Sequence, residues 1–301
     1  MKDARTHPVG LITVTYSPGD TLTTMLDSIG AATDREVAIV ISDNGSRDGS
    51  IERVEQRPGV QVVRNPGNLG FGRGVNVAMQ ALPADADPVL VVNPDVTFGP
   101  GAIDALIQGL ARHPEAGIVG PLITTPDGRI YPSARQLPSI GTGVGHAVFG
   151  WFWPDNPWTR AYRRDHADPI ERQAGWLSGS CLLIRRKAFE EVGGFDPAFF
   201  MYFEDVDLGD RMARAGWRSI YLPDASVVHI GGHATAQHRP EMTRVHHLSA
   251  YRYLARRYSR WWQAPLRLAI RCALFLRGVV AGRSGRVAGG AALPDNRPAG
   301  S

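Results

Sequence analysis

The chain has 301 residues, of which 43% are hydrophobic and 21% charged, and this is typical of a globular protein with one large domain or two small ones. No uncharged apolar stretch reaches the ~18 residues of a transmembrane helix, and residues 1–8 lack the apolar core of a secretion signal, so we expect a cytoplasmic protein. The formal net charge of +4 is unevenly spread, because Glu241 and Asp295 are the only carboxylates from Arg239 onward.

The first 120 residues alternate between strand-like and helix-like segments. Short apolar runs predict strands, and helical spacing of apolar residues predicts helices between them. The predicted strands are 11–15, 37–41, 60–63, 89–92 and 117–120, and the predicted helices are 21–29, 74–82 and 102–111. This alternation favours an α/β, Rossmann-like fold with a mostly parallel sheet and helices on both faces. Ligands bind such sheets beyond the carboxyl ends of the strands, where the polar clusters 43–48 and 93–95 fall.

The second part of the chain is less regular. Thr125-Pro126-Asp127-Gly128 predicts a hairpin turn. Residues 135–175, rich in glycine, proline and aromatic side chains, form either a buried aromatic cluster or a loop that faces an acceptor or a membrane. Cys181 and Cys272 lie in apolar sequence without metal-binding spacing, which predicts reduced core residues. The remaining predicted elements are a strand at 176–184 interrupted at 178–180, helices at 187–192 and 205–215, and strands at 219–222 and 227–229.

Asp43 opens the segment Asp43-Asn44-Gly45-Ser46-Arg47-Asp48, directly after a predicted buried strand. These residue types are the ones that turns favour, so a plain turn is one interpretation. A nucleoside site is the other, because a carboxylate there can accept a hydrogen bond from the imide N–H of uracil or thymine.

The segment Asn68-Leu69-Gly70-Phe71-Gly72-Arg73-Gly74-Val75-Asn76 is rich in glycine and runs into a predicted helix. Such a segment lets backbone N–H groups approach a phosphate at the positive end of a helix. It lacks the Gly-Lys-Ser/Thr ending of a Walker loop and the spacing of the dinucleotide fingerprint.

Three further positions are candidates for chemistry. Asn93-Pro94-Asp95 ends a buried strand, so Asp95 either caps a turn or holds Mg²⁺ or Mn²⁺ together with substrate phosphates. Glu204-Asp205-Val206-Asp207 follows an aromatic run; its acids suit the start of a helix, but carboxylates crowded beside apolar surface also suit a general base. His229 ends an apolar strand, and it is either structural or a ligand of a metal held by Asp95.

Taken in order, these motifs resemble one family over residues 8–235. The resemblance is to the family 2 inverting glycosyltransferases of the GT-A fold, and within them to the bacterial rhamnosyltransferases. The motifs that carry it are Thr13-Val14-Thr15-Tyr16, Asp43-Asn44-Gly45-Ser46, residues 68–76, Asn93-Pro94-Asp95, Trp176-Leu177-Ser178-Gly179-Ser180, Phe195-Asp196, Glu204-Asp205-Val206-Asp207-Leu208 and His229-Ile230-Gly231-Gly232.

The resemblance implies a role for each matching position. Asp205 would be the catalytic base, with Glu204 as the second candidate and Asp207 as a support for the loop. Asp95 would hold Mg²⁺ or Mn²⁺ on the diphosphate, and His229 would complete the metal site; Asn93 replaces the first acid of the family's Asp-x-Asp motif. The substrate-binding residues would be Thr13, Thr15, Tyr16, Asp43, Asn44, Asn68, Gly70, Arg73, Asn76 and Asn93 on the donor side, and Trp176, Ser178 and Gly179 on the acceptor side.

The implied reaction moves L-rhamnose from dTDP-L-rhamnose onto a lipid-linked acceptor, N-acetylglucosamine on a polyprenyl diphosphate. A divalent metal offsets the charge of the leaving diphosphate, and a carboxylate takes the proton of the acceptor hydroxyl. Attack from the opposite face then inverts the anomeric centre. The alternatives are a UDP-sugar donor (UDP-GlcNAc or UDP-galactose) or a non-catalytic sugar-nucleotide binder, and the acidic cluster at 204–207 argues against the binder.

Residues 239–285 form a predicted basic helical extension of the 1–238 catalytic domain, which we divide into a nucleotide-sugar half, 1–120, and an acceptor half, 121–238. Arg252, Arg256 and Arg260 recur at helical spacing, as do Arg267 and Arg271, with apolar residues between them. We expect this region to bind the anionic inner face of the cell membrane rather than nucleic acid. A basic face packed on the catalytic domain or on a partner subunit is the alternative. Residues 286–301 are predicted to be a disordered tail.

Overall fold

The computed structural model of the protein describes residues 8–138, 169–231 and 239–274. The chain divides into two units, Met1–Gln237 and His238–Ser301, beside the boundary expected at residue 238. The tail expected at 286–301, the end of the basic region and most of the segment 135–175 lie outside the described residues.

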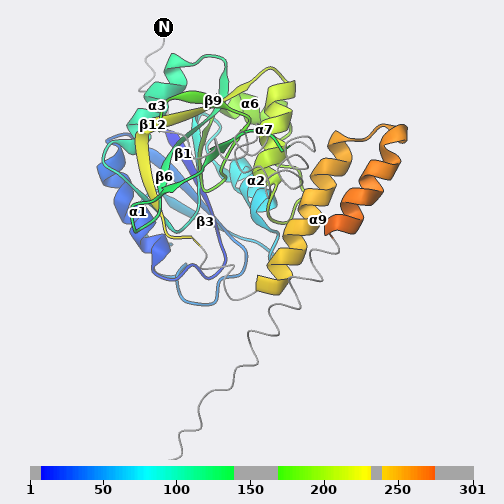
Figure 1. Ribbon diagram of the computed structural model, residues 1–301. Helices are drawn as coiled ribbons and strands as arrows, with labels where there is room; N and C mark the ends of the chain where they lie inside the picture. The colour runs from blue at the N-terminus through cyan, green and yellow to red at the C-terminus, as the bar shows by residue number, and fades with distance from the viewer. Residues whose placement is uncertain (1–7, 139–168, 232–238, 275–301) are drawn as a thin grey trace, which may run out of the picture. The chain divides into compact units, whose positions relative to one another are not determined.

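A ten-stranded sheet forms the centre of the first unit (Figure 1). Its main path has the order β3-β2-β1-β4-β11-β6-β12-β5. Strands β1 to β4 are parallel to one another, as are β6 and β12, whereas β11 is antiparallel to β4 and β6, and β5 is antiparallel to β12. The expected mostly parallel α/β fold is confirmed. The bounds are β1 (Val9–Thr15), β2 (Val37–Asp43), β3 (Val60–Arg64), β4 (Val89–Val92), β5 (Val96–Phe98), β6 (Ala116–Thr124), β11 (Cys181–Ile184) and β12 (Arg218–His229).

Helices cover both faces of this sheet (Figure 1). Successive strand residues point to opposite faces, so Leu11 packs in one apolar cluster and its neighbour Ile12 in the other. The first cluster includes buried side chains of α1 (Thr21–Ala32) and α3 (Ala102–Arg112). The second includes those of α2 (Phe71–Ala81), α6 (Arg186–Glu191) and α7 (Glu204–Arg214). Burial on both faces explains why the strands read as continuous apolar runs.

Short strands complete the acceptor half. The predicted turn at 125–128 joins β6 to β7 (Ile130–Tyr131) as an antiparallel hairpin, which confirms that prediction. β8 (Ala134–Arg135) pairs with β10 (Trp176–Leu177), and β9 (Arg172–Ala174) adds to the main sheet beside β12.

Several expected boundaries were wrong. Helix α2 begins at Phe71 rather than at residue 74, so Gly72 and Gly74 lie inside it. The two strands expected at 219–222 and 227–229 are one strand, β12, with an irregularity between Leu222 and Ser226. The boundary expected near residue 120 falls inside β6, so the two expected halves share one sheet. Cys181 is buried as expected, but Cys272 is exposed, so the expectation that it is a core residue was wrong.

The second unit begins with α9 (Arg239–Arg257), followed by the short helix η2 (Trp261–Gln263) and a helical stretch at 264–274. Among the residues that the structure describes, no helix combines the length and the apolar character needed to span a bilayer.

Candidate active site

A closed polar network joins the carboxyl ends of β1 and β2. Asp43 is 5% exposed, and its Oδ1 accepts hydrogen bonds from the hydroxyls of Thr15 (2.9 Å) and Ser46 (2.6 Å). The Ser46 hydroxyl in turn accepts the backbone N–H of Ser17 at 2.8 Å. The network fixes the loop after β1, which carries the half-exposed Tyr16, against the loop after β2. The expected Thr15, Tyr16 and Asp43 therefore lie together at the ligand-binding edge of the sheet.

Thr13 lies deeper in β1 than the network. Its side chain is fully buried, and its hydroxyl has no hydrogen-bond partner in the described part of the chain. Direct contact of Thr13 with a substrate stays a prediction, since no exposed atom of this side chain supports it.

Asn44 holds the glycine-rich segment in place. Its amide donates to the carbonyl of Gly70 at 3.2 Å, and its carbonyl oxygen accepts the Asn65 amide at 2.9 Å. The exposed Asn68 accepts the backbone N–H of Gly70 through its side chain at 2.9 Å. Asn44 thus connects the end of β2 to the start of α2.

Close packing accounts for the glycines of this segment. Gly70 has a φ of +83°, and a Cβ there would lie 2.1 Å from the carbonyl oxygen of Phe200. Cβ atoms at Gly72 and Gly74 would lie 2.9 Å from Phe195 and 2.8 Å from Val14. The backbone N–H of Phe71, at the start of α2, already donates to the Phe200 carbonyl at 3.1 Å. The phosphate contact expected near Gly70 stays a prediction, and the geometry gives the glycines a packing role.

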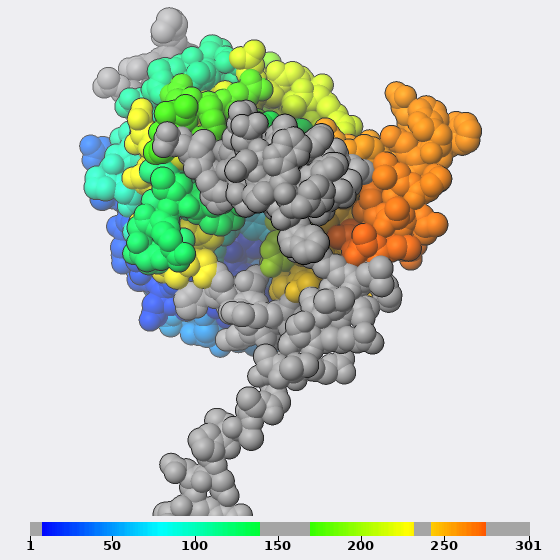
Figure 2. Space-filling view, in the orientation of Figure 1, coloured from blue at the N-terminus to red at the C-terminus, as the bar shows by residue number. Residues whose placement is uncertain are grey.

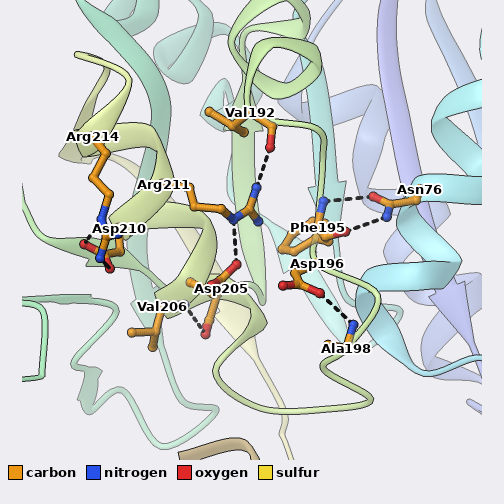
Figure 3. A network of polar contacts seen from close by, with 11 residues as sticks. Asn76, Val192, Phe195, Asp196, Ala198, Asp205, Val206, Asp210, Arg211 and Arg214 are labelled. Carbon is orange, nitrogen blue, oxygen red and sulfur yellow. Dashed lines mark hydrogen bonds and ion pairs between the residues drawn. The ribbon is translucent and has the colours of Figure 1, made fainter. Parts of the chain in front are cut away.

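Arg73 and Asn76, both on α2, contact the 195–198 segment. Arg73 Nε donates to the Pro197 carbonyl at 2.7 Å. The side-chain amide of Asn76 both donates to and accepts from the backbone of Phe195, at 2.7 and 2.9 Å (Figure 3). Both the nitrogen and the oxygen of the Asn76 amide are thus bonded to the protein backbone. This gives Asn76 a structural role, and its expected contact with the substrate stays a prediction.

Asp95 and His229 meet across the sheet edge, where β12 pairs with β5. His229 Nε2 lies 3.1 Å from Asp95 Oδ1 and 3.4 Å from the side-chain nitrogen of Asn93. Asp95 Oδ2 accepts the backbone N–H of Gly231 at 3.0 Å. Burial works to raise the pKa of Asp95, but the hydrogen bonds from His229 and Gly231 outweigh it and lower that pKa. Asp95 is therefore held as a carboxylate.

This pair fits a divalent cation that is shared with a substrate. One carboxylate oxygen and one imidazole nitrogen are ligands that Mn²⁺ accepts, and Mg²⁺ is commonly held by a single carboxylate plus phosphates. In the described residues, no group of three or more His, Cys, Asp and Glu side chains gathers for a metal. The protein thus supplies only part of a coordination shell here.

The ring of Tyr131 packs edge-on against His229, with centroids 6.3 Å apart. The hairpin that carries Tyr131, green in Figure 2, lies at the surface of this face.

The turn at 178–180 connects the Asp95–His229 pair to the acidic segment 204–207. The Ser180 carbonyl accepts the backbone N–H of Asn93 at 2.9 Å, and the Gly179 N–H donates to Asp205 Oδ2 at 3.0 Å. The hydroxyls of Ser178 and Ser180 lie 3.1 Å apart. Beside the turn, the indole N–H of Trp176 donates to the Gln136 carbonyl at 3.1 Å. The two candidate segments predicted from the sequence, 93–95 and 204–207, therefore border one short turn.

Glu204 and Asp205 begin α7 with opposite environments. Asp205 accepts two backbone N–H groups, from Gly179 and from Val206 (2.8 Å; Figure 3), whereas Glu204 is 7% exposed and its Oε2 has no partner among the described residues. Burial, together with the charge of Asp205, raises the pKa of Glu204 to about 8. Burial also raises the pKa of Asp205, while its two amide donors and the nearby Arg135 work to lower it. The two amide donors therefore favour the first negative charge of the pair on Asp205, and burial favours the protonated form of Glu204.

The backbone before α7 is strained. Tyr202 and Phe203 have φ values of +66° and +67°, in the left-handed region that costs roughly 1–2 kcal/mol for each such residue. On the next turn of the helix, Asp207 pairs with Arg211 Nε at 2.6 Å, and Arg211 donates to the Val192 carbonyl at 2.7 Å (Figure 3). These contacts match the supporting role expected for Asp207. Strain of this kind is concentrated at functional sites.

Three residues of the site did not stand out in the sequence. Ser46 looks like an ordinary turn residue, although it completes the Asp43 network. Tyr131 and Arg135 lie in two-residue strands, which are too short to show a period. Only the pairing partners, His229 and Trp176, could have drawn attention to them.

Comparison with known proteins gives two family matches. Residues 11–193 match the family model described as Glycosyl transferase family 2, and residues 163–286 match Glycosyl transferase family group 2. The chain is 50% identical over 289 residues to the N-acetylglucosaminyl-diphospho-decaprenol L-rhamnosyltransferase of Mycobacterium tuberculosis, with 93% of this chain and 94% of that protein covered. It is 27% identical over 255 residues to the rhamnosyltransferase WbbL of Escherichia coli K12, with 83% and 93% covered.

Solved structures show the same fold at lower sequence identity. The mannosyltransferase PcManGT from Pyrobaculum calidifontis, in complex with GDP-Man and Mn²⁺, superposes with a TM-score of 0.57 at 18% identity, covering 96% of this chain and 77% of that one. GalNAc-T7 with UDP, GalNAc and Mn²⁺ gives a TM-score of 0.56 at 16% identity, with 75% and 44% covered. The arrangement of the sheet is that of the GT-A fold.

Proposed function

The chain belongs to glycosyl transferase family 2, and from that premise we propose that it transfers L-rhamnose from dTDP-L-rhamnose to N-acetylglucosamine carried on a polyprenyl diphosphate. The observation that carries the proposal is the 50% identity to the mycobacterial rhamnosyltransferase over 93% of this chain. The identity extends over nearly the whole length of both chains, and the site described above supplies the groups that the reaction needs.

The donor side binds and orients the nucleotide sugar. Asp43 keeps one oxygen, Oδ2, only weakly engaged with the Ser46 N–H at 3.3 Å, so this oxygen can accept the imide N–H of thymine. Asp95 and His229 would hold Mg²⁺ or Mn²⁺ on the donor's diphosphate. That ion supplies positive charge beside the departing phosphate when it is bound. Two similar solved structures contain Mn²⁺, which supports a divalent ion in this fold.

The acceptor side removes a proton. The Asp205 carboxylate takes the hydroxyl proton of N-acetylglucosamine as its oxygen attacks the anomeric carbon, and the C–O bond to the diphosphate breaks. The Gly179 and Val206 amides hold Asp205 in one orientation, so its proton-accepting lone pair does not need to reorganise. Attack opposite the leaving group inverts the anomeric centre, so dTDP-β-L-rhamnose yields an α-L-rhamnoside.

A donor and acceptor panel tests this function. Purified chain with N-acetylglucosamine on a short polyprenyl diphosphate should release dTDP from dTDP-L-rhamnose and form a rhamnosyl product visible by mass spectrometry. Product from UDP-GlcNAc or UDP-galactose, with none from dTDP-L-rhamnose, would overturn the donor assignment. Nucleotide binding without release on adding acceptor would instead indicate a non-catalytic binder.

The second unit would bring the enzyme to the inner face of the cell membrane, where the lipid-linked acceptor lies. Residues 239–274 contain eight arginines and one carboxylate, Glu241. The expected arginine stripe is wrong in detail, because α9 ends at Arg257 and leaves Arg260 outside the helix. Arg267 also donates to the carbonyls of Tyr258 and Arg260, both at 2.9 Å.

Exposed tryptophans are the stronger membrane feature. Trp261 is 81% exposed and Trp262 54% exposed, and the Arg260 guanidinium lies 5.0 Å from the Trp262 ring. Tryptophan beside arginine suits the headgroup region of an anionic bilayer. A Trp261→Ser/Trp262→Ser variant should lose co-sedimentation with phosphatidylglycerol vesicles, while Ile170→Ser, a 62% exposed residue of the first unit, should not. Unchanged vesicle binding by the double variant would exclude this surface.

A further inference from the structure

Arg135, on the acceptor side of the site, uses only part of its guanidinium for hydrogen bonds within the described residues. Its Nε donates to the Pro132 carbonyl at 2.9 Å, and its Cζ lies 5.8 Å from the centre of the Trp176 ring. Its two terminal nitrogens have no hydrogen-bond or ion-pair partner within residues 8–138, 169–231 and 239–274. The side chain is partly buried, and these two nitrogens carry four of its five N–H donors.

Two other arginines have more structural partners, although the Nη2 of Arg211 is itself unpartnered among the described residues. Arg211 pairs with Asp207 and with the Val192 carbonyl, and Arg172 donates to the Ala134 carbonyl while packing over the Tyr221 ring at 4.7 Å. Both have structural partners that explain their presence. In the described part of the chain Arg135 makes one such hydrogen bond, and a guanidinium has five N–H donors.

The position of Arg135 places it beside the proposed base. β8 pairs with β10 so that Arg135 lies opposite Trp176. The Trp176 backbone in turn packs closely on α7, where a Cβ at Gly209 would lie 2.8 Å from the Gly175 carbonyl and 2.9 Å from Trp176 Cβ. Arg135 is near enough to Asp205 for its charge to lower the pKa of that carboxyl, yet no ion pair joins the two within the described residues. A cation close to the base, but not neutralised by it, is available for an anion of the substrate.

We propose that Arg135 binds the diphosphate of the lipid-linked acceptor. This inference rests on the proposed function, in which the hydroxyl that Asp205 deprotonates belongs to a sugar attached directly to a diphosphate. The planar fork of a guanidinium matches two phosphate oxygens, and such charged hydrogen bonds are stronger than neutral ones. In the proposed function the donor's own diphosphate would be held through a metal by Asp95, after β4, and His229, at the end of β12, so different groups would bind the two diphosphates.

Two acceptor substrates distinguish binding of the acceptor's diphosphate from other roles of Arg135. One carries N-acetylglucosamine on a short polyprenyl diphosphate, and the other carries it on a neutral alkyl chain of matched length. We expect Arg135→Ala to raise KM for the diphosphate acceptor about 10- to 100-fold, the range for loss of a charged hydrogen-bonded contact. KM for the neutral acceptor and for the donor should stay within about twofold, and Arg135→Lys should recover part of the loss.

Different outcomes overturn the proposal. An equal loss on both acceptors, with a shifted pH profile of kcat, would show that Arg135 acts only through Asp205. A raised donor KM would assign it to the donor's phosphates instead.

A binding measurement keeps the test independent of turnover. EDTA removes divalent metal ions, so phosphate binding through a metal at Asp95 would not contribute. Under this condition, calorimetry with geranyl diphosphate as the probe should show weaker binding to Arg135→Ala than to the wild type. Equal binding would overturn the proposal. If the wild type bound this probe through Arg135 but transferred no sugar, the proposed function would fail while the diphosphate site remained.

Discussion

The donor edge of the site, around Asp43, and the acceptor edge, around Glu204 and Asp205, place their polar groups in opposite environments. At the donor edge, Asp43 is surrounded by hydroxyl and amide donors from Thr15 and Ser46. At the acceptor edge, Glu204 is buried with an oxygen that has no partner among the described residues, and the two residues before it are held at positive φ. Asp43 is thus held by several hydrogen bonds while its Oδ2 stays only weakly engaged, whereas the acceptor edge retains unfavourable electrostatic and backbone energy.

The contrast follows from what each edge does. A binding pocket needs one fixed shape, which a closed hydrogen-bond network provides. A general base needs raised basicity, and burial raises the pKa of Asp205 even though two backbone amides donate to it. We therefore expect changes at the acceptor edge to act on kcat and pH dependence, and changes at the donor edge to act on KM.

The largest effect should come from Asp205→Asn. Removing the base should lower kcat by about 10²- to 10⁴-fold, because the amide cannot take the acceptor's proton. Donor affinity, measured by calorimetry with dTDP, should change little. Glu190→Gln, a 64% exposed carboxylate on α6, is the control for loss of a charge elsewhere. Near-normal turnover by Asp205→Asn would remove this residue from the mechanism.

The next largest effect should come from Asp95→Ala. Loss of the carboxylate that would hold the metal should lower kcat/KM on the order of 100-fold, since the leaving diphosphate loses its counter-charge. The variant should also need more Mn²⁺ for half-maximal activity, which a metal titration measures. Full activity of the wild type in excess EDTA would disprove the metal assignment.

A smaller effect is expected for Glu204→Gln, and it concerns the pH dependence of the free energy of unfolding. Folding raises the pKa of Glu204 to about 8, so the folded state binds its proton more tightly than the unfolded state does. The stability this contributes is complete below the unfolded pKa of about 4.3, and is lost as pH rises toward 8, by roughly 1.4 kcal/mol per pH unit.

Urea unfolding at pH 5.5 and 7.5 measures this dependence. The wild type should lose on the order of 2 kcal/mol more than Glu204→Gln between the two pH values. A parallel pH dependence of the two proteins would show that Glu204 is ionised in the folded state, and would remove the contrast between the two edges.

The smallest effect should come from Ser46→Ala at the donor edge. Its hydroxyl donates to Asp43 and accepts from the Ser17 backbone, so its loss loosens the pocket without touching the base. We expect donor KM to rise about 5-fold, near the 1 kcal/mol of a neutral hydrogen bond, with kcat unchanged. Thr24→Ala, which removes an exposed hydroxyl on α1, is the control. A fall in kcat without a change in KM would contradict the division between the edges.

Much of the donor half could be predicted from sequence, because its strands are continuous apolar runs that end in polar residues. Asp43 and Asp95 were placed at the sheet edge by that pattern alone, and their proposed roles came from a family resemblance that the comparisons confirm. The antiparallel insertion of β11 between β4 and β6 could not be predicted, since strand direction leaves no mark on a short buried run. Arg135 was missed for a similar reason, as its importance depends on a partner 41 positions away in β10.

The contact between Gly70 and Phe200 has a consequence for recombination among related enzymes. It joins the segment that begins α2 to the loop that precedes α7, and no side chain fits at position 70 while the Phe200 carbonyl lies so near. A chimera that takes its sugar-nucleotide portion from one parent and its acceptor portion from another would be cut along this contact. Such a hybrid should remain foldable only if both sides of the junction are exchanged as a matched pair.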